Sequence, residues 1–347
     1  MPDFMTDLDG NSLTREVIDR FADTGDPRLK AVIASLVRHL HGFVQDVELT
    51  VEEWGAALEF LARAGRACTE GRQEFVLLSD VLGVTMLVDS INHPTAGGTT
   101  ETAPPGPFHA ADAPELPLGA DMARGQPGER LHVEGSVSSG DGRPLANAVV
   151  DVWQADENGY YDMQRPELTE PTLRARFRAD GRGRFAFRSI LPSHYPIPAG
   201  GPVGELLNAT GRHPFRPAHI HFRIAAEGYE TLVTQLFPAD GPYLADDAAF
   251  GVKPSLVVAC PQGAPGDAPD GSAGPWRRLA YDFVLKAQAS ASSVQKGAGR
   301  HVCGEGTSAG EVVLGHAHMP TIVGLADKNH ADESTQVDQA RENDIRG

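Results

Sequence analysis

Histidine pairs of the form His-x-His are the first candidates for chemistry in this sequence, because two neighbouring imidazoles can bind one metal ion. The sequence contains three such pairs, which are His39 and His41, His219 and His221, and His316 and His318. Residues two apart point to one face of a strand but to nearly opposite sides of a helix. The chemistry open to each pair therefore depends on the element that carries it.

Only the middle pair falls in a strand pattern. Residues 219–224 read His-Ile-His-Phe-Arg-Ile, an alternation that predicts two imidazoles on one face of a strand. The pair at 39 and 41 lies in a helical stretch and is interpreted as partly exposed helix histidines. The pair at 316 and 318 lies in a polar stretch without periodicity, where chance or weak metal binding is the simpler interpretation. Because a strand pair alone is more often structural, the hypothesis of a metal site depends on its neighbours.

Two tyrosine sites upstream supply further donors. Tyr160 and Tyr161 lie in Asn-Gly-Tyr-Tyr-Asp, and Tyr195 lies in Leu-Pro-Ser-His-Tyr-Pro-Ile-Pro. Each tyrosine alone would be interpreted as capping the sheet with its hydroxyl in water. Together, two phenols and two imidazoles form a ligand set suited to trivalent iron, since such an ion can hold the hard phenolate oxygen deprotonated.

These motifs, in this order, resemble those of the intradiol ring-cleavage dioxygenases. The resemblance includes both tyrosine segments and extends over about residues 12–285. Its other motifs are Val-Val-Asp-Val-Trp-Gln-Ala-Asp at 149–156, Arg-Pro-Ala-His-Ile-His-Phe at 216–222 and Thr-Gln-Leu-Phe at 234–237. The resemblance implies that O2 opens an aromatic diol or triol between its two hydroxylated carbons, giving a muconate-type diacid.

The resemblance also implies a role for each site residue. It implies one non-haem Fe(III) per subunit, bound by Tyr161, Tyr195, His219 and His221. Of the two adjacent tyrosines, the family pattern selects Tyr161 rather than Tyr160. Tyr195 would also leave the iron and accept a proton when the substrate binds. Arg216 and Gln235 would face the substrate ring and stabilise the charge that develops there.

The resemblance further implies which ring is cleaved. A helical N-terminal domain is similar to the catechol-type branch of the family, and an acid at Asp80 is similar to the hydroxyquinol 1,2-dioxygenases, where it can hydrogen-bond the third hydroxyl. Leu77 lies three residues earlier, on the same helix face. The pocket residues expected are Leu77, Asp80, Pro105, Gly106, Phe108, Ile197, Pro198 and Arg216. The dipeptide Pro104-Pro105 departs from the hydroxyquinol pattern, so catechol and chlorocatechol 1,2-dioxygenases stay open as alternatives.

The elements that must position these residues divide the chain into parts of different character. Residues 1–94 are nearly free of proline and predict a helical domain, with a capping box at Thr50 and one apolar helix over 73–89 before Pro94. Residues 95–130 are rich in glycine and proline and are interpreted as a connector. Short alternating strands over 131–287 predict an antiparallel β-sandwich that carries the catalytic site. The expected fold class is α+β, followed by a disordered tail over 288–347.

The charge and residue composition of the chain limit the kinds of partner and the compartment that we expect. With 30 Lys and Arg against 47 Asp and Glu, the net charge of −17 makes nucleic acid and anionic membrane surfaces poor partners. No apolar run is long enough to span a bilayer, the N-terminus has no export signal pattern, and the three cysteines lie far apart. These features predict a reducing cytoplasm. The family resemblance and the spare apolar helix face point to a homodimer through the N-terminal helices, with bound lipid as a possibility.

Two rival functions explain part of the pattern. A cupin-type Fe(II) site also uses His-x-His on a strand, but it needs a third histidine from a later strand, and none occurs between His221 and His301. A transthyretin-like or immunoglobulin-like binding module would explain the sandwich, but it gives no reason for the set of tyrosines and histidines.

Overall fold

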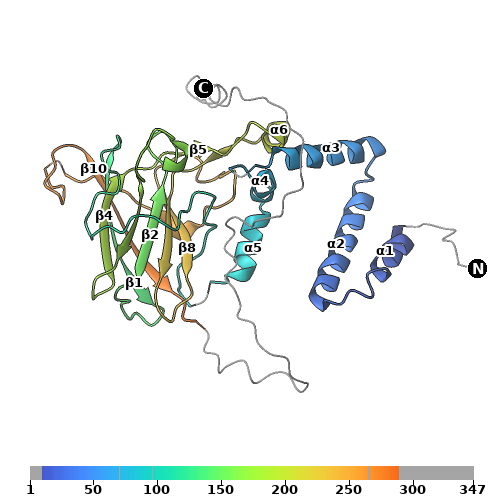
Figure 1. Cartoon of the computed structure of the whole chain (residues 1–347), viewed down its shortest axis with the longest axis horizontal. Coiled ribbons are helices and arrows are strands. Elements are labelled where there is room, and N and C mark those ends of the chain that lie inside the picture. The colour runs from blue at the N-terminus through green and yellow to red at the C-terminus, as the bar shows by residue number, and fades with distance from the viewer. Residues whose placement is uncertain (1–9, 70, 96, 265, 289–347) are drawn as a thin grey trace, which may run out of the picture. The chain divides into compact units, whose positions relative to one another are not determined.

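The computed structural model of this chain describes residues 10–288, except residues 70, 96 and 265. The chain forms two compact units, which divide between Thr69 and residue 70 (Figure 1). The expected tail, apart from Gln288, and the histidine pair at 316 and 318 lie outside the described residues.

The first unit contains three described helices. These are α1 (Gly10–Asp19), α2 (Pro27–Asp46) and α3 (Val51–Ala67). The predicted capping box at the start of α3 is confirmed, because Thr50 and Glu53 exchange hydrogen bonds with each other's backbone N–H groups. Among the described residues of these helices only Ala64 is buried, while Leu40 and Trp54 are each about half exposed. The unit therefore carries apolar surface that its own packing does not cover.

The histidines of α2 do not converge. His39 Nδ1 lies 2.8 Å from the carbonyl oxygen of Ser35, whereas His41 Nδ1 lies 2.9 Å from Thr14 Oγ1 on α1. Their interpretation as helix histidines fits these separate contacts. None of the described helices combines the length and the apolar character that crossing a lipid bilayer requires.

The second unit opens with two short helices, α4 (Glu74–Val81) and α5 (Val84–Asn92). The prediction of one helix over 73–89 was wrong, because Leu82 and Gly83 separate the two. Gly83 has a φ of 72°, in the left-handed region that glycine adopts at little cost, and it is the N-cap of α5.

Two layers of sheet form most of the second unit. The bounds of its remaining elements are β1 (Arg130–Ser139), β2 (Val149–Gln154), the 3-10 turn η1 (Asp162–Gln164), β3 (Arg174–Arg178), β4 (Arg184–Ile190), β5 (Tyr195–Pro196), α6 (Pro202–Ala209), β6 (Phe215–Arg216), β7 (Ile220–Ala225), β8 (Leu232–Pro238), η2 (Pro254–Leu256), β9 (Val257–Val258) and β10 (Trp276–Leu285). One sheet has the strand order β10-β1-β4 and the other β3-β2-β7-β8-β9, while β5 and β6 form a separate pair.

The expected sandwich is present, but it is not wholly antiparallel as predicted. β10 pairs with β1 in parallel, and β9 pairs with β8 in parallel. Parallel neighbours need long connections, and β10 reaches β1 only after the whole of the other sheet has been built. Period-two patterns identify strands but not the direction in which distant strands pair, so the two parallel pairings could not be predicted from the sequence.

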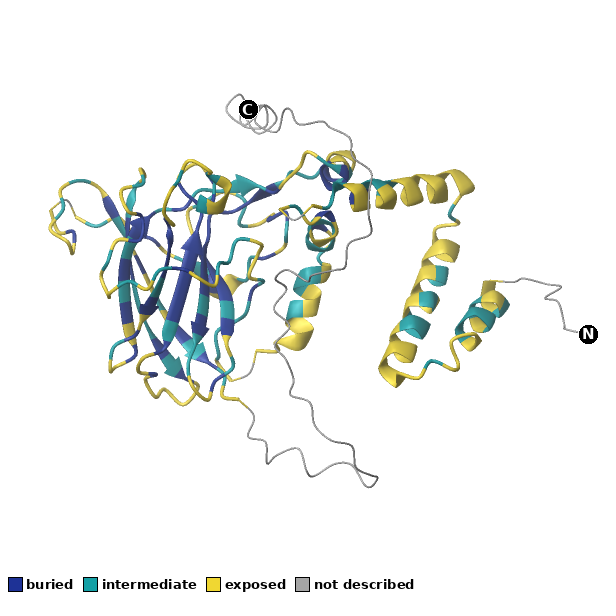
Figure 2. Ribbon diagram, in the orientation of Figure 1, coloured by how far each residue is buried: buried dark blue, intermediate teal, exposed yellow. Residues whose placement is uncertain are grey.

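The five-stranded sheet has two faces of different chemistry. One face packs its apolar side chains, such as Val152 and Phe222, against the other sheet in a core that is dark blue in Figure 2. On the other face, register places a row of buried polar and aromatic residues side by side across four strands: Arg174, Trp153, His221 and Gln235. The core thus fixes strand β7, and β7 holds a histidine of the predicted metal site.

Removing the core side chain next to that histidine tests this coupling. Phe222 is fully buried, with its ring centroid 5.0 Å from that of Phe283 and 6.4 Å from that of Phe187. We expect Phe222→Ala to lower the free energy of unfolding by about 3–5 kcal/mol, and the milder Ile224→Val on the same face by about 0.5–1.5 kcal/mol. Urea denaturation measures both, and equal losses would contradict this packing.

Candidate metal centre

Four donor atoms from distant parts of the chain converge at one end of the sandwich. Tyr161 Oη lies 3.3 Å from Tyr195 Oη, 3.1 Å from His221 Nε2 and 3.5 Å from His219 Nε2. His219 Nε2 lies 3.3 Å from Tyr195 Oη and 3.1 Å from His221 Nε2. Donors that share one ion at roughly 2.0–2.2 Å are themselves about 3.0–3.5 Å apart. The spacing therefore fits a single metal ion.

Strand geometry supplies the two histidines and Tyr195. His221 is in β7 and His219 directly precedes that strand, so both imidazoles project to the same side, as the pattern predicted. Tyr195 is in β5 and pairs with Arg216 of β6. This antiparallel pair of short strands places a donor and a cationic group opposite each other.

A tight turn after β2 supplies Tyr161. Asp156 Oδ1 accepts hydrogen bonds from the N–H groups of Asn158 and Tyr160, and Gly159 has a φ of 81°. A side-chain carbon at Gly159 would stand 2.7 Å from Cβ of Tyr195, so only glycine fits this approach. The turn buries Tyr161 completely, whereas the ring of Tyr160 lies 5.9 Å from the guanidinium carbon of Arg165.

Burial sets the protonation states of the donors in the absence of a cation. It raises the pKa of the Tyr195 phenol and, together with the charge of Tyr195, raises the pKa of Tyr161 well above its ordinary value. Burial and the nearby charge of Arg216 lower the pKa of His219 to about 3. Burial also lowers the pKa of His221 well below its usual range. The imidazoles are thus neutral, as metal ligands must be, and the phenols ionise only beside an added positive charge.

The two imidazoles are oriented by different means. His219 donates from Nδ1 to the carbonyl oxygen of Pro217 at 2.8 Å, which leaves the Nε2 lone pair facing the other donors. His221 instead stacks on Trp153, with centroids 4.8 Å apart and planes within 6°. On the far side of the site, Phe108 stacks on Tyr161 at 4.2 Å.

No alternative ligand set competes within the described residues. There, no group of three or more His, Cys, Asp or Glu side chains is arranged to hold a metal. The two phenols are therefore necessary to any metal centre at this place, and their hard anionic oxygens suit a trivalent ion such as Fe(III).

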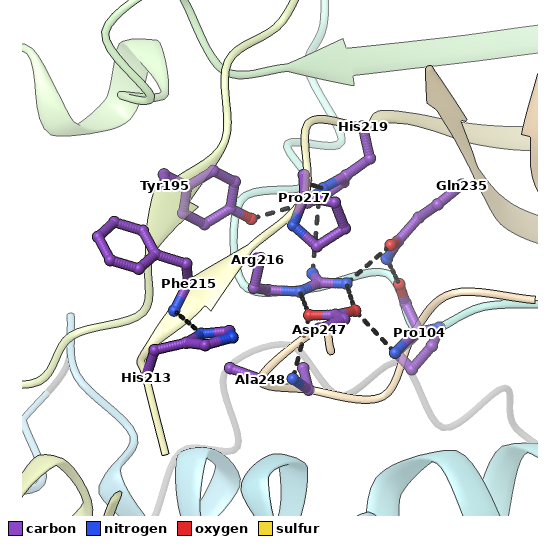
Figure 3. Close-up of polar contacts among 12 residues, drawn as sticks. Pro104, Tyr195, His213, Phe215, Arg216, Pro217, His219, Gln235, Asp247 and Ala248 are labelled. Atoms are coloured by element: carbon purple, nitrogen blue, oxygen red, sulfur yellow. Dashed lines mark hydrogen bonds and ion pairs between the residues drawn. The ribbon is translucent and has the colours of Figure 1, made fainter. Parts of the chain in front are cut away.

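A charged network adjoins the donors (Figure 3). The Arg216 guanidinium donates to Asp247 from Nε at 3.1 Å and from Nη2 at 3.2 Å, and Nη2 also donates to Gln235 Oε1 at 3.0 Å. Gln235 in turn donates from Nε2 to the carbonyl oxygen of Pro104 at 2.8 Å. Arg216 Nη1 lies 3.4 Å from His219 Nε2.

Asp247 keeps this cation ionised and fixed. Burial alone would lower the pKa of Arg216, but the charges of Asp247 and Tyr195 raise it above its ordinary value. Burial likewise favours protonated Asp247, yet Arg216 lowers its pKa below the usual range. The N–H groups of Ala249 and Gly251 donate to the same carboxylate. A positive charge is therefore held rigidly beside the place where a substrate would lie.

The structure brings some expected pocket residues close to this centre. A side-chain carbon at Gly106 would lie 3.4 Å from His221 Cε1. Leu77 packs on the cluster that contains Ile197 and Ala248, next to Asp247. Asp80 accepts a hydrogen bond from Thr85 Oγ1 at 2.6 Å, and burial raises its pKa above the ordinary value.

Two other expected pocket residues are exposed. Pro198 is exposed, and its carbonyl oxygen lies 3.5 Å from Arg72 Nη2. Pro105 is also exposed. Their expected role at the substrate stays a prediction.

Sequence reasoning missed three groups that shape the site. Asp247 has no motif around it, since its partner Arg216 is distant in sequence. Trp153 lies in the motif at 149–156, which contributed only to the family resemblance. Its place in a strand that pairs with the histidine strand could have indicated a contact with His221. Arg174 binds Asp162, which follows Tyr161, and donates to the carbonyl oxygen of Phe108 at 2.9 Å.

Comparison with known proteins assigns the family. The family model described as "Dioxygenase" matches residues 105–287, and the one described as "Catechol dioxygenase N terminus" matches residues 26–100. The chain therefore belongs to the intradiol ring-cleavage dioxygenases, oxidoreductases that depend on non-haem iron, as the sequence motifs predicted.

Individual relatives are similar over most of their length. A 6-chlorohydroxyquinol 1,2-dioxygenase of Cupriavidus pinatubonensis is 48% identical over 81% of this chain and 99% of its own. A hydroxyquinol 1,2-dioxygenase of a Rhizobium species is 50% identical over 70% of this chain and 82% of its own. The solved structure of hydroxyquinol 1,2-dioxygenase from Pseudomonas putida DLL-E4 is 45% identical, with a TM-score of 0.77 over 80% of this chain and 99% of that one.

The adjacent tyrosines provide a matched test of the donor set. We expect Tyr161→Phe to lower iron occupancy and turnover by at least the roughly 10- to 100-fold that changes around metal ligands cost. Tyr160→Phe removes a hydroxyl of the same kind one residue away and should keep both. Metal analysis and visible absorption of the purified variants measure the outcome, and iron loss in Tyr160→Phe alone would mean that the wrong neighbour was chosen.

Two adjacent acids, Asp246 and Asp247, provide a matched test of the charged network around Arg216. Asp247→Asn leaves the buried guanidinium with a neutral partner, so Arg216 loses its fixed position, and we expect kcat to fall about 10- to 100-fold with iron retained. Asp246→Asn changes an exposed acid that pairs with His213 at 3.0 Å and should leave kcat near its original value. Steady-state kinetics with iron quantification distinguishes the two, and unchanged kcat in Asp247→Asn would contradict the role of this carboxylate.

Proposed function

We propose that this protein is a hydroxyquinol 1,2-dioxygenase, which cleaves 1,2,4-trihydroxybenzene with O2 to 3-hydroxy-cis,cis-muconate, the enol form of maleylacetate. One non-haem Fe(III) per subunit would be bound by Tyr161, Tyr195, His219 and His221. The observation that carries the proposal is the convergence of two phenols and two imidazoles, in which five pairs of donor atoms lie 3.1–3.5 Å apart. Both oxygen atoms of O2 enter the product, so the reaction needs no further reductant.

When bound, the ferric ion would supply the Lewis acidity that binds a catecholic substrate as its dianion. Two substrate hydroxyls must then lose their protons, one to a side chain of the protein and the other to a hydroxide that the substrate would displace. Tyr195 is suited to accept one, because it is part-exposed at the edge of the site and burial favours its protonated form. Tyr161, which is fully buried beneath Phe108, would stay in place as a fixed donor.

Arg216 would stabilise negative charge on the ring. Its guanidinium is held by Asp247 and Gln235, so it need not reorganise as charge develops. The aromatic and aliphatic side chains around the site, including Phe108 and Ile197, would orient the ring and limit the access of water.

Asp80 supports a triol over a diol as substrate. The Asp80 carboxylate accepts one hydrogen bond from Thr85 Oγ1, and the third hydroxyl of hydroxyquinol can donate a second one that plain catechol cannot supply. The named relatives act on hydroxyquinol or 6-chlorohydroxyquinol, which supports the same assignment. Catechol or chlorocatechol 1,2-dioxygenase is the alternative, because Pro104-Pro105 departs from the hydroxyquinol pattern.

We further propose that the protein is a homodimer joined through its helical N-terminal domain, with lipid as a possible filler of the interface. The half-exposed Leu40, Phe43 and Trp54 on α2 and α3 support an apolar contact of this kind. A cytoplasmic location is proposed as well, since Cys68 and Cys260 are free thiols.

Oxygen uptake with hydroxyquinol, catechol and 4-chlorocatechol tests the substrate directly. We expect the highest kcat/KM for hydroxyquinol, and Asp80→Ala should lower the hydroxyquinol-to-catechol ratio by about 10- to 100-fold, the worth of one hydrogen bond to a charged group. Asp89→Asn, an acid on α5 that pairs with Lys253, is the control and should keep the ratio. A preference for catechol in the unchanged chain would replace hydroxyquinol by the alternative.

A further inference from the structure

The short helix α4 is held at both ends by hydrogen bonds to residues at the start of α6 and just after it. It contains eight residues, Glu74–Val81, and no side chain caps its N-terminus. Isolated helices of this length are marginal in water, so the position of α4 must come from its packing and its ends. Figure 1 shows α4 beside α6, with which it is in contact.

The first residue of α4 is tied to the start of α6. Glu74 is fully buried, and its Oε1 accepts a hydrogen bond from the N–H of Val203 at 2.9 Å. The N-cap of α6 is Gly201, which has no side chain to satisfy that N–H group, so Glu74 does this from another helix. Arg72 balances the carboxylate with a 2.8 Å contact from Nε to Oε2.

The last residue of α4 is tied to the chain just after α6. Arg212 donates from Nη1 to the carbonyl oxygen of Val81 at 2.6 Å and from Nη2 to that of Ala248 at 3.1 Å. A cation at this place also suits the negative end of the helix. The guanidinium carbon lies 4.9 Å from the ring centroid of Phe250, which holds the side chain in place.

The two ties enclose the residues that face the substrate in the proposed function. Leu77 and Asp80 lie between Glu74 and the carbonyl of Val81 on the same helix. Between the ties, α4 packs against α6 and Ile197 through one buried apolar cluster. Because α6 connects β5 to β6, which carry Tyr195 and Arg216, any shift of α4 changes the distance from Asp80 to the reacting end of the substrate.

We propose that Glu74 and Arg212 are positioning residues that fix α4 relative to the β5–β6 strand pair and thereby determine discrimination for the third hydroxyl of the substrate. This inference rests on the proposed function. It gives a reason for a buried carboxylate and a part-buried guanidinium, neither of which touches the four metal donors.

Kinetics of the full-length, iron-loaded protein tests the effect on specificity. We expect Arg212→Met and Glu74→Met, each of which removes the polar group that forms a tie, to lower the hydroxyquinol-to-catechol ratio of kcat/KM about tenfold, mainly through a higher KM for hydroxyquinol. Iron content and visible absorption should not change, and Arg212→Lys, whose single ammonium group can still donate to one of the two carbonyl oxygens, should restore part of the ratio. Equal losses on both substrates, or an unchanged ratio, would overturn the proposal.

A matched control separates this effect from general destabilisation. Arg188→Met also removes an arginine that binds a carbonyl oxygen, that of Gly119 at 3.1 Å, and an acid, Asp270 at 2.9 Å, and it should keep the ratio. Failure of the proposed function shows differently, as absence of hydroxyquinol-dependent oxygen uptake in the unchanged chain.

Hydrogen exchange without substrate tests the ties independently of the reaction. Amides of α4 should exchange faster in Glu74→Met and Arg212→Met than in Arg188→Met. If exchange of α4 were the same in all three variants, the proposal would be overturned whatever ring the enzyme cleaves.

Discussion

The cost of burying a phenolate is the constraint on which the rest of the site depends. Tyr161 is completely buried, and burial raises its pKa well above the ordinary value, so its anion exists there only beside a compensating cation. In the proposed site, two phenols, two neutral imidazoles and a trivalent ion would together meet this constraint. The protein then needs to hold four donors within about a hydrogen bond's length of one another before the metal arrives.

The register of the sheet and the side chains that contact the donors provide that arrangement. His221 takes its place from β7, whose opposite face is anchored in the core by Phe222. Around the donors, Pro217 orients His219 and Trp153 orients His221. Asp247 fixes Arg216 in the same way, which adds a permanent positive charge without coordinating the metal. The fold therefore positions the donors through its strands and then fixes their orientation through neighbouring side chains.

Much of this could be predicted from the sequence, because the donors lie in local patterns. His219 and His221 share a strand face, and the Gly-Tyr-Tyr turn and the short Tyr195 strand are marked by glycine and proline. The parallel pairing of β10 with β1 and the contact of Asp247 with Arg216 could not be predicted, since they join residues far apart without a local signal. The helix break at Gly83 could have been predicted from the glycine, but the apolar residues on both sides of it favoured one continuous helix.

The ligand sphere of the purified protein tests the central claim most directly. X-ray absorption at the iron edge, combined with resonance Raman excitation in the visible band, should show one ferric ion per chain with tyrosinate oxygen and histidine nitrogen ligands. A protein that cleaves aromatic diols at full rate while containing zinc or no metal, or iron without any tyrosinate vibration, would contradict the account.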